Sequence, residues 1–258
     1  MAAGVPQEKA TQTLILYGNM LKEGIAIDEF SYKKGVRELE GAGTSTSISA
    51  LGILHALYGE IDLALATFQQ EDLFADSTVA ANYAFMLQHI GKVNLLYECI
   101  YDLAEVHRTK GLTTNAYSMA YRFGDTQRLE KYFDMHIKML SEDENRSGAE
   151  THKQELLSEI QCAYRLSNCS EEQFRMVAET VWAIVDKYQL RTGFVEVSNH
   201  SSSCYVVDLL GKDADYLASV NWELAEQICK LDELDDCALV ARFSPPRELH
   251  AGISYDSY

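Results

Sequence analysis

The sequence predicts an α+β protein, with helical hairpins through about residue 140 and a compact α+β sandwich after it. The chain has 258 residues and is 47% hydrophobic, which is enough to bury one large core or two modest ones. Glycines recur at a regular interval in the helical first half, and apolar–polar alternation follows the break near residue 150. We predict a helical repeat domain at 1–140, a linker at 141–152, an α+β domain at 153–246 and a C-terminal tail at 247–258.

The repeat interval is defined by Gly24, Gly59, Gly91 and Gly124, which are 35, 32 and 33 residues apart. Each glycine lies near the end of a segment with helical apolar spacing and precedes a second amphipathic segment. Glycine adopts positive φ without strain, as a tight helix end requires. The spacing therefore predicts repeated pairs of antiparallel helices.

The clearest repeat contains Leu51-Gly52, then Gly59, and then Ala64 with Phe68 four residues later. This pattern resembles the tetratricopeptide repeat, which places Leu-Gly on the first helix and Ala-x-x-x-Phe on the second. The small Gly52 and Ala64 are expected to let the two helices approach closely, while Phe68 fills the gap to the next hairpin.

The other repeats keep the interval better than the residue pattern. Ile48 occupies the signature tryptophan position of the best repeat, and the closing proline is missing from every repeat. A non-repetitive helical bundle therefore stays open as the alternative. The expected packing positions are Ala84, Leu96 and Ile100 in the second repeat and Tyr117, Leu129 and Phe133 in the third.

The resemblance also implies a binding surface, because the first helices of such repeats line a concave face that usually binds peptides. The simpler alternative makes Leu57 and Phe85 core residues and His89 a helix-end histidine. Transferred position by position, the partner-binding residues are Ile53, Leu57, Phe85, Gln88, His89, Ser118, Tyr121 and Arg122.

The second half begins after the polar, acidic stretch 141–152. Residues 159–166 alternate roughly between apolar and polar, which favours a strand; a helix continuing from Thr151 is the alternative. Ser170 and Gln173 form a capping box that opens a helix. Asp213 is the predicted N-cap of a second helix.

Three further strands are predicted at 193–198, 204–210 and 237–243, the last ended by Pro245 and Pro246. The resulting order βαββαβ is similar to that of ferredoxin-like folds. Alternation assigns one apolar sheet face to Ile160, Cys162, Tyr164, Val195, Val197, Tyr205, Val207, Leu209, Leu239, Ala241 and Phe243. The opposite face would be open and would carry Arg165, Glu196, Val206, Asp208, Val240 and Arg242.

That open face has few aromatic residues and mixed charge, so it does not suit RNA stacking. We expect it to pack on another domain or on a second copy of the chain, which would form a homodimer.

The strong negative charge of the chain argues against nucleic acid and anionic membranes as partners. The net charge is -17, with 13 Lys and Arg against 21 Asp and Glu in residues 1–150 and 9 against 18 in residues 151–258. Such a surface repels nucleic-acid phosphates and anionic lipid. The chain begins without a secretory signal, and no apolar run is long enough to span a bilayer, so we expect a cytoplasmic protein that binds neither membrane nor nucleic acid.

No segment carries a convincing catalytic or metal-binding signature. The Asn199–Cys204 segment holds nucleophile and base types together, but such a hairpin tip is usually solvated. The six cysteines form no C-x-x-C pair and are interpreted as small buried residues in a reducing compartment. We expect no catalytic residue, metal or cofactor.

Three functions remain open. The leading hypothesis is a non-catalytic adaptor that binds a protein or peptide on the repeat surface. An acidic nucleic-acid mimic that inhibits a DNA- or RNA-binding enzyme is the second hypothesis. The third is an enzyme whose site is assembled from distant residues.

Overall fold

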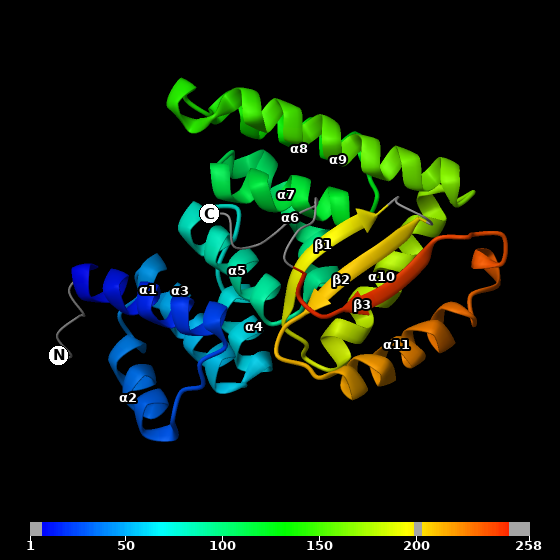
Figure 1. The fold of residues 1–258 in the computed structure, drawn as a ribbon. Helices are drawn as coiled ribbons and strands as arrows, with labels where there is room; N and C mark the ends of the chain where they lie inside the picture. Colours follow the sequence, from blue (N-terminus) through cyan, green and yellow to red (C-terminus); the bar gives the residue numbers. More distant parts are fainter. Residues whose placement is uncertain (1–6, 199–202, 248–258) are drawn as a thin grey trace. The chain divides into compact units, whose positions relative to one another are not determined.

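The computed structural model describes residues 7–198 and 203–247, which form helices followed by a small sheet (Figure 1). The predicted α+β class is confirmed. The elements are α1 Gln7–Glu23, α2 Glu29–Leu39, α3 Ser45–Tyr58, α4 Ile61–Gln69, α5 Ser77–His89, α6 Val93–His107, α7 Lys110–Arg122, α8 Thr126–Met139, α9 Arg146–Leu166, α10 Glu171–Lys187, β1 Thr192–Ser198, β2 Cys204–Leu209, α11 Ala214–Ile228 and β3 Val240–Ser244, with 3₁₀ turns at Glu142–Glu144 and Asp232–Leu234.

The chain divides into two compact units. The first comprises Met1–Ile90 with Asp102–Leu112, and the second comprises Gly91–Tyr101 with Thr113–Tyr258. The helices α6 and α7 therefore each contribute to both units.

The first unit is organised around α3, which packs against α1, α2, α4 and α5. Close approach of α3 and α4 depends on Gly52, because a Cβ there would lie 2.3 Å from Cε2 of the buried Phe68. Phe68 in turn lies against Tyr83 of α5, with ring centroids 5.4 Å apart. The packing expected of the clearest repeat is confirmed at these residues.

The four regularly spaced glycines lie at the ends of helices, as their spacing predicts. Gly24, Gly59, Gly91 and Gly124 follow α1, α3, α5 and α7, with φ of 69°, 94°, 78° and 75°. Residues with a side chain rarely adopt this left-handed conformation. The prediction that glycine permits each helix to end sharply is therefore confirmed.

In the second unit, α7 and α8 form a hairpin whose inner residues are aromatic. The rings of Tyr117 and Phe133 stack with centroids 4.1 Å apart, and Leu129 is fully buried. The hydroxyl of Thr114 lies 3.2 Å from Nδ1 of His136. The third predicted repeat therefore exists as a helical hairpin.

The strand predicted at 159–166 is wrong, because these residues belong to the long helix α9. Leu156, Leu157, Ile160 and Ala163 are buried at helical spacing, and this outweighs the local alternation. Asn145 caps α9 by accepting a hydrogen bond from the Gly148 amide, so most of the predicted linker is the first part of this helix. The ferredoxin-like order lacks its first strand.

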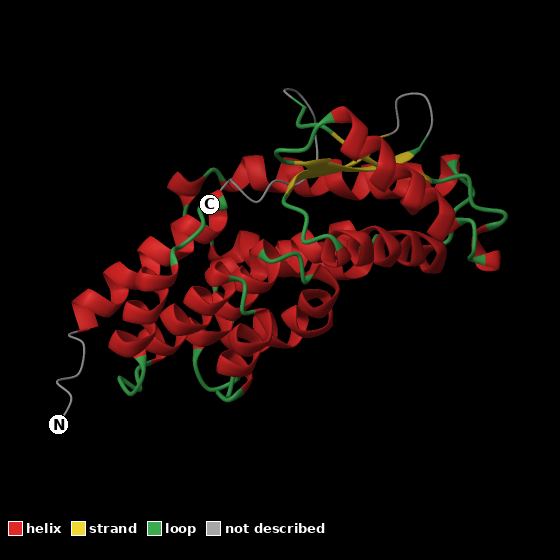
Figure 2. Ribbon diagram, turned by 90° about the horizontal axis from the view of Figure 1, so that it is seen from below, coloured by secondary structure: helices red, strands yellow, loops and turns green. Residues whose placement is uncertain are grey.

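The sheet has the order β1-β2-β3, with β1 antiparallel and β3 parallel to β2 (Figure 1). Figure 2 shows the strands nearly edge-on. The helix α10 packs on β3 and on α11, and α11 packs on β3. The predicted caps are confirmed: Ser170 forms a capping box with Gln173, and Asp213 accepts from the Tyr216 amide. The predicted inward residues Val195, Val197, Tyr205, Val207, Leu209, Leu239 and Phe243 are buried, whereas Ala241 is half-buried.

The opposite face of β1 and β2 is not open. Glu196, Val206 and Asp208 are buried, whereas Val240 and Arg242 on β3 are exposed. The helix α9 packs against β1, and Arg247 pairs with Glu196 and Asp208. The expected exposure of the face is therefore wrong at the first two strands.

Two sequence predictions fall outside the described residues: the tip of the β1–β2 hairpin at 199–202 and the tail after Arg247. Within the described ranges, none of the helices combines the length and apolar character needed to cross a bilayer.

Candidate functional site

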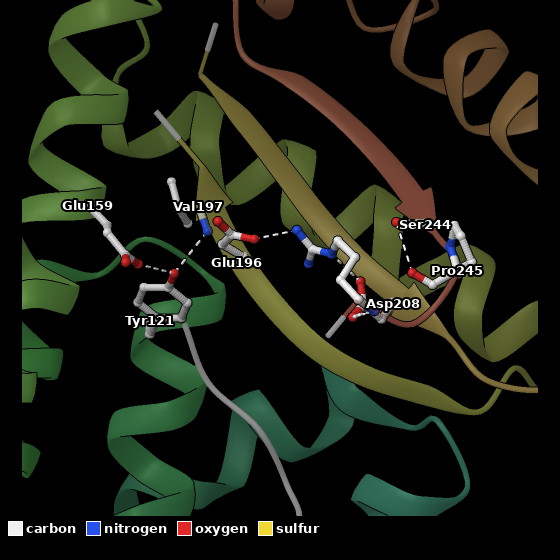
Figure 3. A network of polar contacts seen from close by, with 8 residues as sticks. Tyr121, Glu159, Glu196, Val197, Asp208, Ser244 and Pro245 are labelled. Carbon is white, nitrogen blue, oxygen red and sulfur yellow. Dashed lines mark hydrogen bonds and ion pairs between the residues drawn. The ribbon is translucent and has the colours of Figure 1, made fainter. Parts of the chain in front are cut away.

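Polar side chains from five segments meet at β1 and β2 (Figure 3). They are Tyr121 of α7, Glu159 of α9, Glu196 of β1, Asp208 of β2 and Arg247, which follows β3; we call them the sheet polar cluster. All five belong to the second unit. Glu196 and Asp208 interrupt otherwise apolar strands, so each carboxylate needs a partner to offset the cost of burial.

Tyr121 connects two helices to the edge of the sheet. Its hydroxyl donates to Oε2 of Glu159 at 2.5 Å and accepts a hydrogen bond from the Val197 amide at 2.9 Å. Val197 lies on β1, an outer strand of the sheet, and its amide is therefore satisfied by a side chain rather than by another strand. Tyr121 thus holds α7, α9 and β1 together.

Glu159 has an unusual protonation equilibrium. Burial raises the pKa of Glu159 to about 7, against the lowering effect of the Tyr121 hydrogen bond, and the negative charges of Glu196 and Glu155 raise it further. Burial also raises the pKa of Tyr121 well above its ordinary value, so its phenol stays protonated. Near neutral pH, Glu159 therefore exchanges a proton while Tyr121 remains a hydrogen-bond donor.

We expect this carboxyl to give the protein a pH-dependent stability. The pKa of Glu159 is higher in the folded state, so the folded state binds more protons between about pH 4.5 and 7. Its contribution to stability therefore falls as pH rises through this window. For this half-buried group we expect a loss of about 1–2 kcal/mol.

Glu159→Gln should remove that loss while keeping an acceptor for the Tyr121 hydroxyl. Urea unfolding of wild type and variant at pH 5 and pH 8 measures the difference. Glu150→Gln, an exposed carboxyl on the same helix, is the control and should follow wild type. If the stability of wild type and of Glu159→Gln depended on pH in the same way, Glu159 would not be the source of the effect.

Arg247 pairs with both strand carboxylates. Its Nε donates to Oδ1 of Asp208 at 2.8 Å, its backbone amide donates to Oδ2 of Asp208 at 3.3 Å, and Nη1 contacts Oε2 of Glu196. The carboxylates are 1% and 7% exposed, so they are largely removed from water. One guanidinium thus compensates two buried charges and fastens the segment after β3 across β2 to β1.

Arg122 lies in the core of the second unit, next to Tyr121 in the sequence. Its guanidinium carbon lies 5.1 Å from the centre of the Trp182 ring, and Trp182 Nε1 donates to the Tyr205 hydroxyl at 3.0 Å. Burial lowers the pKa of Arg122 to about 9, with Tyr205 and Tyr121 acting in the opposite direction. The side chain therefore stays charged at neutral pH and stacks on an aromatic face.

The eight residues predicted to bind a partner separate into two groups. Leu57, Phe85, Gln88 and His89 are half-buried on α3 and α5 of the first unit. The other four are buried and contribute to packing: Ile53 in the first unit and Ser118, Tyr121 and Arg122 in the second. The structure places α3 beside α5 and brings Phe85 and His89 together, with ring centroids 4.3 Å apart.

Alternation along the strands places Glu196 and Asp208 on an open sheet face, and no sequence pattern assigns a site role to Glu159 or Arg247. A signal was present for two of them, because Glu196 and Asp208 are charged residues within apolar strands. Their partner Arg247 comes from the segment after β3, 39 residues from Asp208 and 51 from Glu196. No local pattern connects these segments.

A separate open groove of about 630 Å³ lies along α10 and α11. Met176, Ala183 and Ile184 line one side, and Glu223 and Leu231 line the other. The groove has the volume of a small-molecule site but none of the residues of the sheet polar cluster.

Comparison with known proteins gives no family assignment. No protein-family model matches the chain, and no similar curated protein or solved structure is found.

Proposed function

We propose that this chain is a non-catalytic interaction protein that binds a partner segment on the α3–α5 face of its first unit. We define this face by Leu57, Phe85, Gln88 and His89. The proposal treats the hairpins as tetratricopeptide-like. It is supported by the turn glycines and by the close packing of Gly52 against Phe68.

The observation that carries the proposal is the placement of these four side chains on adjacent helices. They come from the C-terminal halves of α3 and α5, and each keeps part of its surface accessible. Gly18 of α1 lies next to Phe85, with 3.8 Å from its ideal Cβ position to the Phe85 ring, so α1 borders the face. Apolar and amide groups on rigid helices suit an extended or helical peptide.

The rest of the first unit supports an interaction role. It exposes several large apolar side chains, and Phe30 on α2 has the largest exposed fraction among them, 78%. Large exposed apolar side chains are available for contact with another protein. The further exposed residues are Ile15, Leu16, Ile25, Phe74 and Val106; Leu63 is also exposed but belongs to α4 and not to the α3–α5 face.

The charge of the chain indicates the kind of partner. A net charge of -17 favours a partner segment that carries lysine or arginine beside its apolar residues. Long-range attraction would then accelerate encounter, and binding would weaken as salt concentration rises.

The sheet polar cluster is the feature that most favours the enzyme alternative, since a carboxyl with a pKa near 7 suits proton transfer. Its carboxylates are, however, engaged by the chain itself. Tyr121 donates to Glu159, and Arg247 forms ion pairs with Glu196 and Asp208. We therefore interpret the cluster as a structural link between α7, α9 and the sheet.

Leu57→Glu tests the proposed face, because it places a charge among the apolar binding groups. Leu63→Glu is the matched control, since Leu63 is exposed on α4, the second helix of the same hairpin. We expect at least a tenfold loss of partner affinity for Leu57→Glu and little change for Leu63→Glu. Affinity capture followed by titration of the recovered partner measures both.

Circular dichroism and urea unfolding would show that both variants stay folded. A partner bound equally well by wild type and Leu57→Glu would contradict the proposed face. Repeated failure to recover a partner with wild type would count against the interaction role itself.

A further inference from the structure

Two cysteines far apart in the sequence meet in the second unit. Cys169 lies between α9 and α10, and Cys237 lies between the 3₁₀ turn Asp232–Leu234 and β3. Both are free thiols, and hydrogen bonds between the residues next to them join the two segments. The positions are 68 residues apart, so the contact is created by the fold.

Hydrogen bonds to backbone carbonyls hold the two segments together on both sides of this contact. The Ala238 amide donates to the Ser167 carbonyl at 2.8 Å, and the Asn168 side chain donates to the Asp236 carbonyl at 3.4 Å. The Gln173 side chain donates to the Glu233 carbonyl at 2.8 Å. The segments that carry the thiols are therefore fixed to each other before any bond forms between the sulfurs.

We propose that Cys169 and Cys237 form a reversible intrachain disulfide when the protein meets an oxidant of the low-molecular-weight disulfide class, such as oxidised glutathione. A protein thiolate attacks the oxidant and forms a mixed disulfide while one glutathione thiol leaves. The second cysteine then attacks the protein sulfur and displaces the other glutathione thiol. Two electrons pass from the cysteines to the oxidant, and their two protons end on the released thiols or in water.

The environments of the two thiols indicate the order of attack. Cys237 is half-buried, whereas Cys169 is only 5% exposed. Burial raises the pKa of the Cys169 thiol, and its contact with Cys237 raises it further. Cys237 is therefore the first nucleophile, and Cys169 completes the disulfide more slowly at neutral pH and faster at alkaline pH.

The disulfide would covalently join the turn before α10 to the segment that leads into β3. In the chain-entropy account, a cross-link that closes a long loop stabilises the folded state. The second unit would thus be more stable when this cysteine pair is oxidised than when it is reduced. A reducing compartment keeps the thiols free until oxidant rises.

Tryptic mapping of the full-length protein tests the proposal directly. Cys169 and Cys237 fall in the peptides 166–175 and 231–242, each of which contains a single cysteine. After native oxidation with oxidised glutathione, blocking of free thiols and digestion, we expect these two peptides to be linked. Free thiols should fall from six to four, and dithiothreitol should restore all six.

Three comparisons make the result specific. Cys237→Ser should give no linked peptides, while Cys229→Ser, which removes an exposed thiol, should still give them. Protein oxidised in urea should lose the preference for this pair. Oxidised wild type should melt several degrees higher than reduced wild type, and Cys237→Ser should show no such shift.

Linkage of other cysteine pairs as the main product would overturn the proposal. It would also be overturned by glutathione adducts at Cys237 without a cross-link, or by six thiols that stay free. Cys237→Ser is preferred to a change at the more buried Cys169, and circular dichroism of the reduced variant checks its fold.

Discussion

Replacing Arg247 with alanine is expected to lower the free energy of unfolding by about 3 kcal/mol. The guanidinium of Arg247 compensates Glu196 and Asp208, which lie on adjacent strands and are almost completely buried. Truncation leaves two like charges close together with no counter-ion and little access to water. Removal of one partner of a buried ion pair is costly for this reason, even where the intact pair adds little net stability.

Urea unfolding followed by circular dichroism measures the loss, with Arg242→Ala as the matched control. Arg242 is an exposed arginine on β3, and its removal should change stability by less than about 0.5 kcal/mol. Adding Glu196→Gln to Arg247→Ala should recover part of the loss, because one of the two uncompensated charges is gone. Equal stability of Arg247→Ala and wild type would show that the ion pairs do not hold this face together.

Gly124→Ala is expected to destabilise the protein by about 3 kcal/mol through two separate effects. The residue has φ of 75°, a conformation that costs alanine about 1–2 kcal/mol. An added Cβ would also lie 2.5 Å from Cδ1 of Phe174, which is fully buried, and 2.9 Å from the Tyr164 hydroxyl. Tyr164 donates to the Gly124 carbonyl, so relief of the overlap also disturbs this hydrogen bond.

Gly211→Ala separates the two effects within the same unit. Gly211 has φ of 67°, and nothing lies within 4 Å of its ideal Cβ position. We therefore expect only the conformational cost there, about 1 kcal/mol. Thermal and urea unfolding of both variants measures the two losses of stability. Equal losses would show that Phe174 and Tyr164 move away from the added Cβ without a measurable cost.

Local signals in the sequence predicted much of the helical architecture. The turn glycines, the capping box at Ser170 and the cap at Asp213 each act within a few residues, so their geometry is encoded locally. Residues 159–166 were assigned to a strand because alternation over eight residues resembles a strand pattern. The buried spacing of Leu156, Ile160 and Ala163 extends beyond that window and determines the helix.

The candidate site was only partly predictable. Tyr121 and Arg122 were selected for a binding surface, but they lie in the core of the second unit. Their partners are Glu159, Val197 and Trp182, on other elements. Helical spacing shows which residues share a face, yet it does not show what packs against that face.

The sequence by itself determined the helical hairpins, their glycine turns, the strand–strand–helix–strand order after α10 and the acidic charge. Each of these depends on residues close together in the chain or on composition. Only the tertiary structure decided that α9 packs against β1, that Arg247 pairs with Glu196 and Asp208, and that the segments of Cys169 and Cys237 lie together. Burial and long-range contact make these pairings favourable, and both arise only when the chain has folded.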